Sequence, residues 1–161
     1  MPKSVTTIDY QTLAALRHQI RRFLRFSEKA ARQAGLEPRQ HQLLLSLKGL
    51  PTGCRPRVGE MAACLQIQHH SAVELVNRLA ARGFIRRHRG GQDGREVLLS
   101  LTPKANNVMK RLAMQHKQEL CSAGPALVAA LGRVMQARQQ SDEFKKKTDW
   151  LTSPQRKKGT I

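Results

Sequence analysis

Residues 68–78 carry hydrogen-bonding side chains at a spacing that suits one face of a helix. They include Gln68, His69, His70, Ser71, Glu74, Asn77 and Arg78. Gln and Asn amides pair with adenine, Glu accepts from the amino group of cytosine, and Ser bonds to a base or a phosphate. Val73, Val76 and Leu79 recur at helical spacing and predict the buried side of the same helix. The polar side is therefore a candidate for contacts with nucleic acid, and the alternative is a solvated polar face.

A basic segment follows this stretch. Its cations are Arg86, Arg87, His88, Arg89 and Arg95. A narrow minor groove has enhanced negative potential that attracts arginine, so Arg89 or Arg95, near the predicted tip, is the best candidate for insertion. DNA phosphates repel Asp93, which we expect to hold a neighbouring arginine by a charge-assisted hydrogen bond. The alternative is a basic hairpin that is merely exposed to solvent.

Four residues of the polar stretch 68–78 also have interpretations other than DNA contact. Arg78 can pair with Glu74 one helical turn earlier instead of contacting DNA. His69 and His70 suggest a metal site, but adjacent helix positions point about 100° apart and do not chelate one ion well. No nearby set of Cys, Asp and Glu completes a tetrahedral site. We therefore expect no metal and no cofactor.

The three cysteines fit no CxxC metal or redox pattern, and their odd number argues against a disulfide-stapled secreted domain. Cys54 lies beside Arg55 and Arg57, and neighbouring positive charge can make a thiol reactive, so Cys54 is a candidate redox residue. Cys64 is flanked by apolar residues on a short helix and is expected in the core. Cys121 carries no signal.

These residues must be positioned by a largely helical chain. Apolar stripes and breakers predict helices from about residue 9 to Gly35, and over about 38–48, 58–65, 69–82, 103–123 and 125–140. Only three residues separate the third helix from the fourth, which is the helix-turn-helix pattern. Gly83 is expected to end the fourth helix in the left-handed conformation, and Thr102 to cap the fifth. Gly124 and Pro125 are expected to break that helix.

Residues 84–88 and 96–101 are predicted as two strands joined by a glycine-rich turn. A β-hairpin after a helix-turn-helix is a wing. The predicted fold class is therefore mainly α with a small β-hairpin wing, namely a winged helix-turn-helix lobe plus a helical dimerisation region. The outer helices have leftover apolar faces, which favour pairing with each other and with a second subunit.

The composition favours a polyanionic partner, because 29 Lys and Arg oppose 11 Asp and Glu and give a net charge of +18. The excess is spread along the chain, so it does not locate a binding face, and a basic, soluble surface is the simpler alternative. No apolar run approaches the ~20 residues that span a bilayer. The N-terminus lacks the apolar core of a signal peptide. We therefore expect a cytoplasmic protein without a membrane contact.

From about residue 40 to 105 the sequence resembles the MarR family. The resemblance lies in residues 58–85, in Asp93 and Arg95 as the D-x-R feature of the wing, and in the run Leu98-Leu-Ser-Leu-Thr-Pro-Lys104. It implies a homodimer with two winged lobes that binds double-stranded DNA, with the first, fifth and sixth helices at the dimer interface. It also implies a repressor that is released from its operator by a small phenolic or other ligand, or by cysteine oxidation.

On this basis the chain has an N-terminal dimerisation helix (1–37), a winged lobe (38–102), C-terminal dimerisation helices (103–140) and a basic tail (141–161) whose role stays open. The leading hypothesis is a dimer on a pseudo-palindromic operator with half-site centres about 10 bp apart. The alternative is a non-specific architectural DNA-binding protein, which the charge and the tail favour. No nucleophile elbow, Gly-rich phosphate loop or paired-carboxylate cleft is recognisable, so we expect no enzyme.

Overall fold

The computed structural model describes the chain at residues 5–90 and 96–152, with side chains described up to Gln136. The chain forms two compact units. One unit consists of residues 24–119, and the other combines residues 1–23 with residues 120–161. The first and last helices each contribute to both units.

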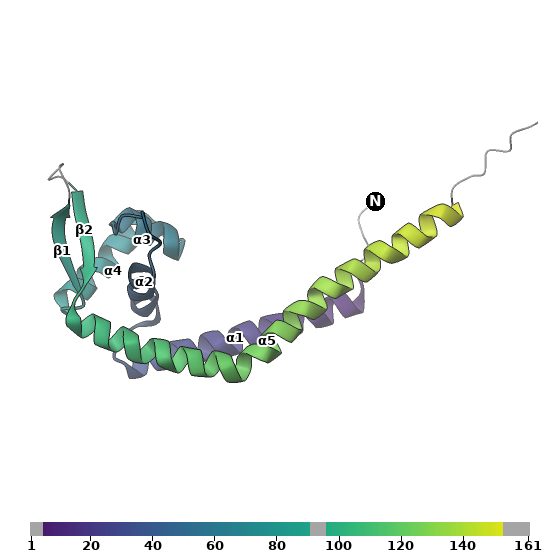
Figure 1. The fold of residues 1–161 in the computed structure, drawn as a ribbon, viewed down its shortest axis with the longest axis horizontal. Helices are drawn as coiled ribbons and strands as arrows, with labels where there is room; N and C mark the ends of the chain where they lie inside the picture. Colours follow the sequence, from purple (N-terminus) through teal and green to yellow (C-terminus); the bar gives the residue numbers. More distant parts are fainter. Residues whose placement is uncertain (1–4, 91–95, 153–161) are drawn as a thin grey trace, which may run out of the picture. The chain divides into compact units, whose positions relative to one another are not determined.

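The described part of the chain contains five helices and a two-stranded antiparallel sheet (Figure 1). In chain order these are α1 (Thr7–Gln33), α2 (Pro38–Lys48), α3 (Val58–Leu65), α4 (His69–Ala81), β1 (Ile85–Gly90), β2 (Glu96–Leu101) and α5 (Pro103–Thr152). The predicted fold class is confirmed, since the hairpin follows a helix-turn-helix in a mainly helical chain.

Helices end where local signals predict. Pro38 occupies the first turn of α2, where its fixed φ suits the helix and its missing N–H is not needed. Gly35 after α1 and Gly83 after α4 have φ values of +78° and +72°, a conformation in which a side chain is strained. Thr102 caps α5, because its hydroxyl accepts from the Ala105 N–H at 3.2 Å and donates to the Gly83 carbonyl at 2.7 Å.

The two strands pair in antiparallel register along their six residues each. Residues 91–95 join them and include the predicted site residues Asp93 and Arg95, which lie outside the described residues. The other edge of β2 is tied to the loop before α3, because the Leu99 N–H donates to the Pro56 carbonyl at 2.7 Å. The hairpin is thus anchored along the outer edge of β2.

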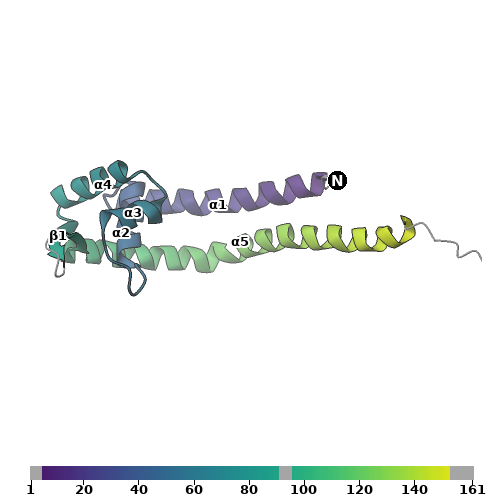
Figure 2. The same cartoon turned by 90° about the horizontal axis from the view of Figure 1, so that it is seen from above.

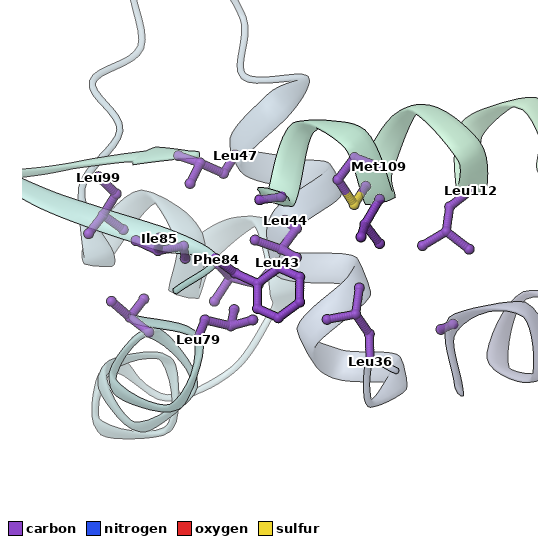
Figure 3. Close-up of a cluster of buried hydrophobic side chains, with 14 of the residues drawn as sticks. Leu36, Leu43, Leu44, Leu47, Leu79, Phe84, Ile85, Leu99, Met109 and Leu112 are labelled. Atoms are coloured by element: carbon purple, nitrogen blue, oxygen red, sulfur yellow. The ribbon is translucent and has the colours of Figure 1, made fainter. Parts of the chain in front are cut away.

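One apolar cluster holds the unit of residues 24–119 together (Figure 3). Its fully buried large side chains include Leu36, Leu43, Leu44, Met61, Val76, Leu79, Leu99 and Leu112. They come from the α1–α2 turn and from α2, α3, α4, β2 and α5. Burying one such side chain contributes about 1.5–3 kcal/mol, so the elements hold one another in place.

The sequence prediction for α5 is wrong in one respect. It ends one helix at Gly124 and starts another at Pro125, whereas the structure has a single helix with Pro125 inside it. An interior proline costs ~3 kcal/mol, but the flanking segments are rich in Ala and Leu, which are strong helix formers. The same helix continues to Thr152 and so includes much of the segment from Ser141 that the sequence predicts as a tail.

In the unit of residues 1–23 and 120–161, the segments of α1 and α5 run in opposite directions (Figure 2). Many of its large apolar side chains are exposed, namely Ile8, Tyr10, Leu13, Ile20, Leu120, Val128, Leu131 and Met135. No helix among the described residues is long and apolar enough to cross a membrane. The exposed side chains therefore leave apolar surface that the helices of this unit do not cover.

Two histidines from different helices meet inside the unit of residues 24–119. His41 on α2 is buried, and its ring lies 5.0 Å from the ring of His116 on α5. Nε2 of His116 is 2.8 Å from the Ser27 hydroxyl on α1, and Nδ1 is 2.7 Å from the Leu112 carbonyl. Burial lowers the pKa of His41, and the neighbouring His116 lowers it further. The folded state therefore disfavours protonation of His41.

We expect the protein to lose stability as the pH falls below 6.5, the ordinary pKa of histidine. The unfolded chain binds this proton more readily than the folded chain, so the stabilising contribution is complete above that pH and declines below it. In His41→Phe, the free energy of unfolding from urea titrations should change less between about pH 8 and about pH 5 than in the wild type. His18→Phe, at an exposed position, should keep the wild-type drop. An undiminished drop in His41→Phe would contradict this assignment.

Candidate nucleic-acid interface

α3 and α4 form the predicted helix-turn-helix. α3 ends at Leu65, and Gln66 then adopts the left-handed conformation with a φ of +54°, which turns the chain towards α4. Gln68 precedes α4 in an extended conformation, and its side chain makes no capping hydrogen bond. Because α3 packs against α4, this turn fixes where the first residues of α4 lie.

α4 buries one side and exposes the other. Ala72, Val76 and Leu79 are buried in the core. Of the residues predicted to contact DNA, Ser71 is half-buried, and the exposed ones are Gln68, His69, His70, Glu74, Asn77 and Arg78. Positions three and four apart share a helical face, so a polar stripe faces away from the core, made of His70, Glu74, Asn77 and Arg78.

Arg78 and Glu74 form an ion pair within this polar stripe, with 3.7 Å between Nη2 and the carboxylate oxygen. Their side chains are 69% and 68% exposed, and such surface pairs contribute ~0–1 kcal/mol. The chain thus adopts the intrahelical pairing that the sequence offers as the alternative to a DNA contact. The pair is weak enough for a phosphate to compete for the guanidinium.

A hydrogen bond links the polar stripe to the wing. Arg87 on β1 donates from its guanidinium to the side-chain oxygen of Asn77. Arg86, His88 and Arg89 are also exposed on this strand. Successive strand residues point to opposite faces, so β1 presents cations on both of its faces. The bond between Arg87 and Asn77 therefore places the polar stripe of α4 next to the cationic strand β1.

One carboxylate lies between two arginines at the end of the hairpin where Gly90 pairs with Glu96. Glu96, at the start of β2, lies 2.7 Å from the guanidinium of Arg55 and 3.5 Å from that of Arg57. Its side chain is 17% exposed. Arg57 also pairs with Glu60 at 3.4 Å. These ion pairs fix the loop before α3 against β2, so the arginines of this loop serve the shape of the wing.

All three cysteines are exposed, which corrects the prediction that Cys64 lies in the core. Met61 and Ala62 define the buried side of the short helix α3, and Cys64 lies off that side. Cys54 is exposed in the loop before α3, where its redox role stays a prediction. Among the described residues, no group of three or more His, Cys, Asp or Glu is arranged to hold a metal ion.

The sequence does not indicate the pairings that connect different elements. It does not predict Arg55 and Arg57 as partners of Glu96, nor the bond between Arg87 and Asn77. The available signal was indirect, because a half-buried carboxylate in a chain rich in arginine is expected to find a cation. Nothing in the spacing of the residues indicates which cation that is.

Residues 34–96 match a family model described as the MarR family. AbsC, a MarR family transcriptional regulator from Streptomyces coelicolor, has a similar fold, with a TM-score of 0.66, 18% identity, and coverage of 89% of this chain and 97% of that one. Wild-type MarR from E. coli in its apo form has a TM-score of 0.59 and 17% identity, with coverage of 75% of this chain and 91% of that one. A mutant of MepR from S. aureus bound to an oligodeoxyribonucleotide has a TM-score of 0.57 and 17% identity, with coverage of 91% of this chain and 99% of that one. The sequence matches no curated protein.

We expect Glu96→Gln to lower the free energy of unfolding by about 1 kcal/mol, because two arginines lose a carboxylate that is shielded from water. Urea denaturation measures the loss, which added salt should reduce only slightly, because partly buried ion pairs are screened much less than exposed ones. The matched control is Glu74→Gln, whose carboxylate is 68% exposed. Its stability should stay within about 0.5 kcal/mol of the wild type. Equal losses in the two variants would argue against a special anchoring role for Glu96.

Proposed function

The chain belongs to the MarR family of transcription regulators, and on this premise we propose that it is a sequence-specific regulator that binds double-stranded DNA as a homodimer. Its operator is a pseudo-palindrome, from which the protein represses transcription in the cytoplasm until a small molecule releases it. Members of this family are regulators and not enzymes. The observation that carries the proposal is the polar stripe of α4 beside the cationic strand β1.

The polar stripe suits the major groove, which admits an α-helix and presents a distinct pattern of donors and acceptors for each base pair. In a helix-turn-helix, the N-terminal residues of the second helix reach the base edges. Gln68, His69 and His70 lie there, followed by Glu74 and Asn77. A surface with donors and acceptors of several kinds is suited to sequence discrimination, whereas non-specific binding needs only positive charge.

The wing supplies positive charge next to this helix. Arg86 and Arg89 are exposed on β1 and suit a phosphate or a narrow minor groove. From the sequence, we propose the same role for Arg95. Asp93 is proposed to orient a neighbouring arginine. The MepR mutant that was solved with an oligodeoxyribonucleotide has a similar fold, which supports DNA as the ligand of this chain as well.

The uncovered apolar side chains of α1 and α5 support the homodimer. Tyr10 and Val128 are 65% and 69% exposed, and Leu13 and Leu131 are close to half exposed. A second copy of the chain would remove these groups from water, which is favourable in proportion to the apolar area. Two-fold symmetry of the protein would then match a pseudo-palindromic operator.

An open pocket in the 24–119 unit supports a small-molecule effector. It has a volume of about 380 Å³ and lies among Leu47, Leu50 and Leu99, with Lys48 and Asn106 on its polar side. Lys48 Nζ donates to the side-chain oxygen of Asn106 at 2.8 Å, so a ligand with an anionic or phenolic oxygen could replace that bond. An effector in this pocket would contact β2 and the first turn of α5. It would therefore act on the position of the wing, to which β2 belongs.

The purified protein should bind the DNA upstream of its own gene at about 150 mM salt and keep that binding against excess unrelated duplex. Protection should cover two half-sites with centres about 10 bp apart, or a multiple of a helical turn. Loss of all binding under competition would favour the non-specific architectural protein instead.

Two variants test the separate roles of helix and wing. His70→Ala should weaken operator binding about tenfold or more while leaving competitor binding almost unchanged, because it removes a base contact. Arg86→Ala should weaken binding to every sequence and reduce the salt slope by about 1, because it removes a phosphate contact. The control Arg133→Ala removes the same charge from an exposed position on α5 and should change neither quantity.

The mass of the protein in solution tests the homodimer. Light scattering should give twice the 18.1 kDa mass of one chain. Leu131→Lys, at a position 47% exposed, should shift the mass towards the monomer, because it places a charge in the proposed interface. Val97→Lys on β2, at a position 46% exposed, is the matched control and should stay dimeric. A wild-type protein that is monomeric at micromolar concentration would contradict the dimer.

A further inference from the structure

Arg82, at the C-terminal end of α4, contacts residues from several other elements of the 24–119 unit. We propose that Arg82 is a positioning residue for DNA recognition, whose guanidinium fixes the orientation of α4 against the end of α1 and the start of α2. This inference rests on the proposed function, because it assumes that α4 reads the operator. It assigns to Arg82 no contact with DNA.

The guanidinium holds two acceptors at once. Nη2 of Arg82 donates to the backbone carbonyl of Gly35 at 2.6 Å, and Nη1 donates to the side-chain oxygen of Gln40 at 2.9 Å. The Gln40 oxygen is itself fixed, since it also accepts from the Glu37 N–H at 3.1 Å, and this side chain is 5% exposed. Hydrogen bonds from a planar, rigid fork define both distance and direction. The end of α4 is therefore oriented against the turn between α1 and α2.

The same arginine is held from its other side by Phe84 and Lys104. Its guanidinium carbon lies 5.2 Å from the centroid of the buried Phe84 ring, and Lys104 Nζ lies 4.5 Å from the same centroid. Such cation–ring contacts are attractive within about 6 Å. Lys104 Nζ also donates to the carbonyl of Arg82 at 2.9 Å. Phe84, just before β1, and Lys104, in the first turn of α5, thus both contact Arg82, which remains exposed to solvent.

Because Arg82 lies at one end of α4, its contacts can set the orientation of the whole helix. α4 packs on α2, α3 and β1, and apolar packing is non-directional. The bond to Gly35 adds a directional link to the turn that ends α1, 47 positions away in the sequence. α4 has 13 residues and is about 20 Å long. A small rotation at its C-terminal end therefore displaces its N-terminal turn, where the proposed base contacts lie, by the largest distance.

A measurement without DNA tests the positioning directly. Spin labels on cysteines placed at Glu74 on α4 and Lys29 on α1, in a background without the native cysteines, report the distance between these helices. The wild type should give one narrow distribution, and Arg82→Gln should broaden or shift it. Arg82→Lys keeps the charge but cannot span both acceptors, so it should do the same and serves if the Gln variant does not fold. Arg39→Gln, at an exposed position of α2, should stay narrow. Unchanged distributions in the Arg82 variants would overturn the proposal.

A second experiment varies the operator found for the wild type, moving the half-sites one base pair closer or farther apart. The Arg82→Gln variant should bind the operator of native spacing about tenfold more weakly than the wild type does. At the altered spacings its loss relative to the wild type should be smaller, because a loosely held α4 adapts to the native and the altered spacings alike. An equal loss at all spacings would indicate general destabilisation and overturn the positioning role. The salt slope should stay at the wild-type value, and a decrease of about 1 would instead identify a phosphate contact and overturn the proposal.

The two experiments separate this inference from the proposed function. A wild-type protein that binds no specific duplex contradicts the proposed function, and the spin-label distances then decide alone whether Arg82 orients α4. A wild-type protein that binds its operator, with Arg82 variants that keep both the narrow distance and the spacing preference, contradicts the role of Arg82 and leaves the proposed function intact.

Discussion

The left-handed turn at Gly83 determines where α4 ends and where the wing begins. The Gly83 N–H bonds back to the carbonyl of Ala80, and the Phe84 N–H to that of Leu79, each at 2.9 Å. These two bonds satisfy carbonyls at the end of the helix and reverse the chain direction. They bring the Phe84 ring into the core and start β1 beside α4. The Gly83 carbonyl, in turn, accepts the hydroxyl of Thr102, so the start of α5 is set by the same turn.

The features that the sequence predicts correctly are those determined within a few residues. Pro38, Gly83 and Thr102 act through their own φ preference or side-chain oxygen, so the helix ends could be located without knowledge of the fold. The exposed side of α4 follows from its periodicity for the same reason. Pro125 does not break α5, because its local cost is outweighed by the helix propensity of both flanks. The bond between Arg87 and Asn77 depends on how β1 approaches α4, which no local pattern encodes.

Arginine has two physical roles in this chain. Glu60, Glu74 and Glu96 each lie within 4 Å of a guanidinium, but only Glu96 is largely shielded from water, so its pairs stabilise the fold more than the exposed pair of Glu74 does. The chain still keeps a net charge of +18, because acids are few. Pairs that are partly shielded from water are little affected by salt, whereas the exposed excess acts over about 8 Å at physiological ionic strength. Added salt therefore weakens the attraction for a polyanion more than it weakens the shielded ion pairs of the fold.

Gly90 limits how the hairpin can be altered. A Cβ built on this buried residue would lie 2.4 Å from Cδ1 of Leu98 on the neighbouring strand, which is closer than real Cβ atoms come. Positions 90 and 98 are therefore expected to covary among related chains, with a side chain at 90 accompanied by a smaller residue at 98. For protein engineering, this makes Gly90 and Glu96 the natural junctions for exchanging the wing tip. A graft between them changes the tip while the packed base of the hairpin stays as it is.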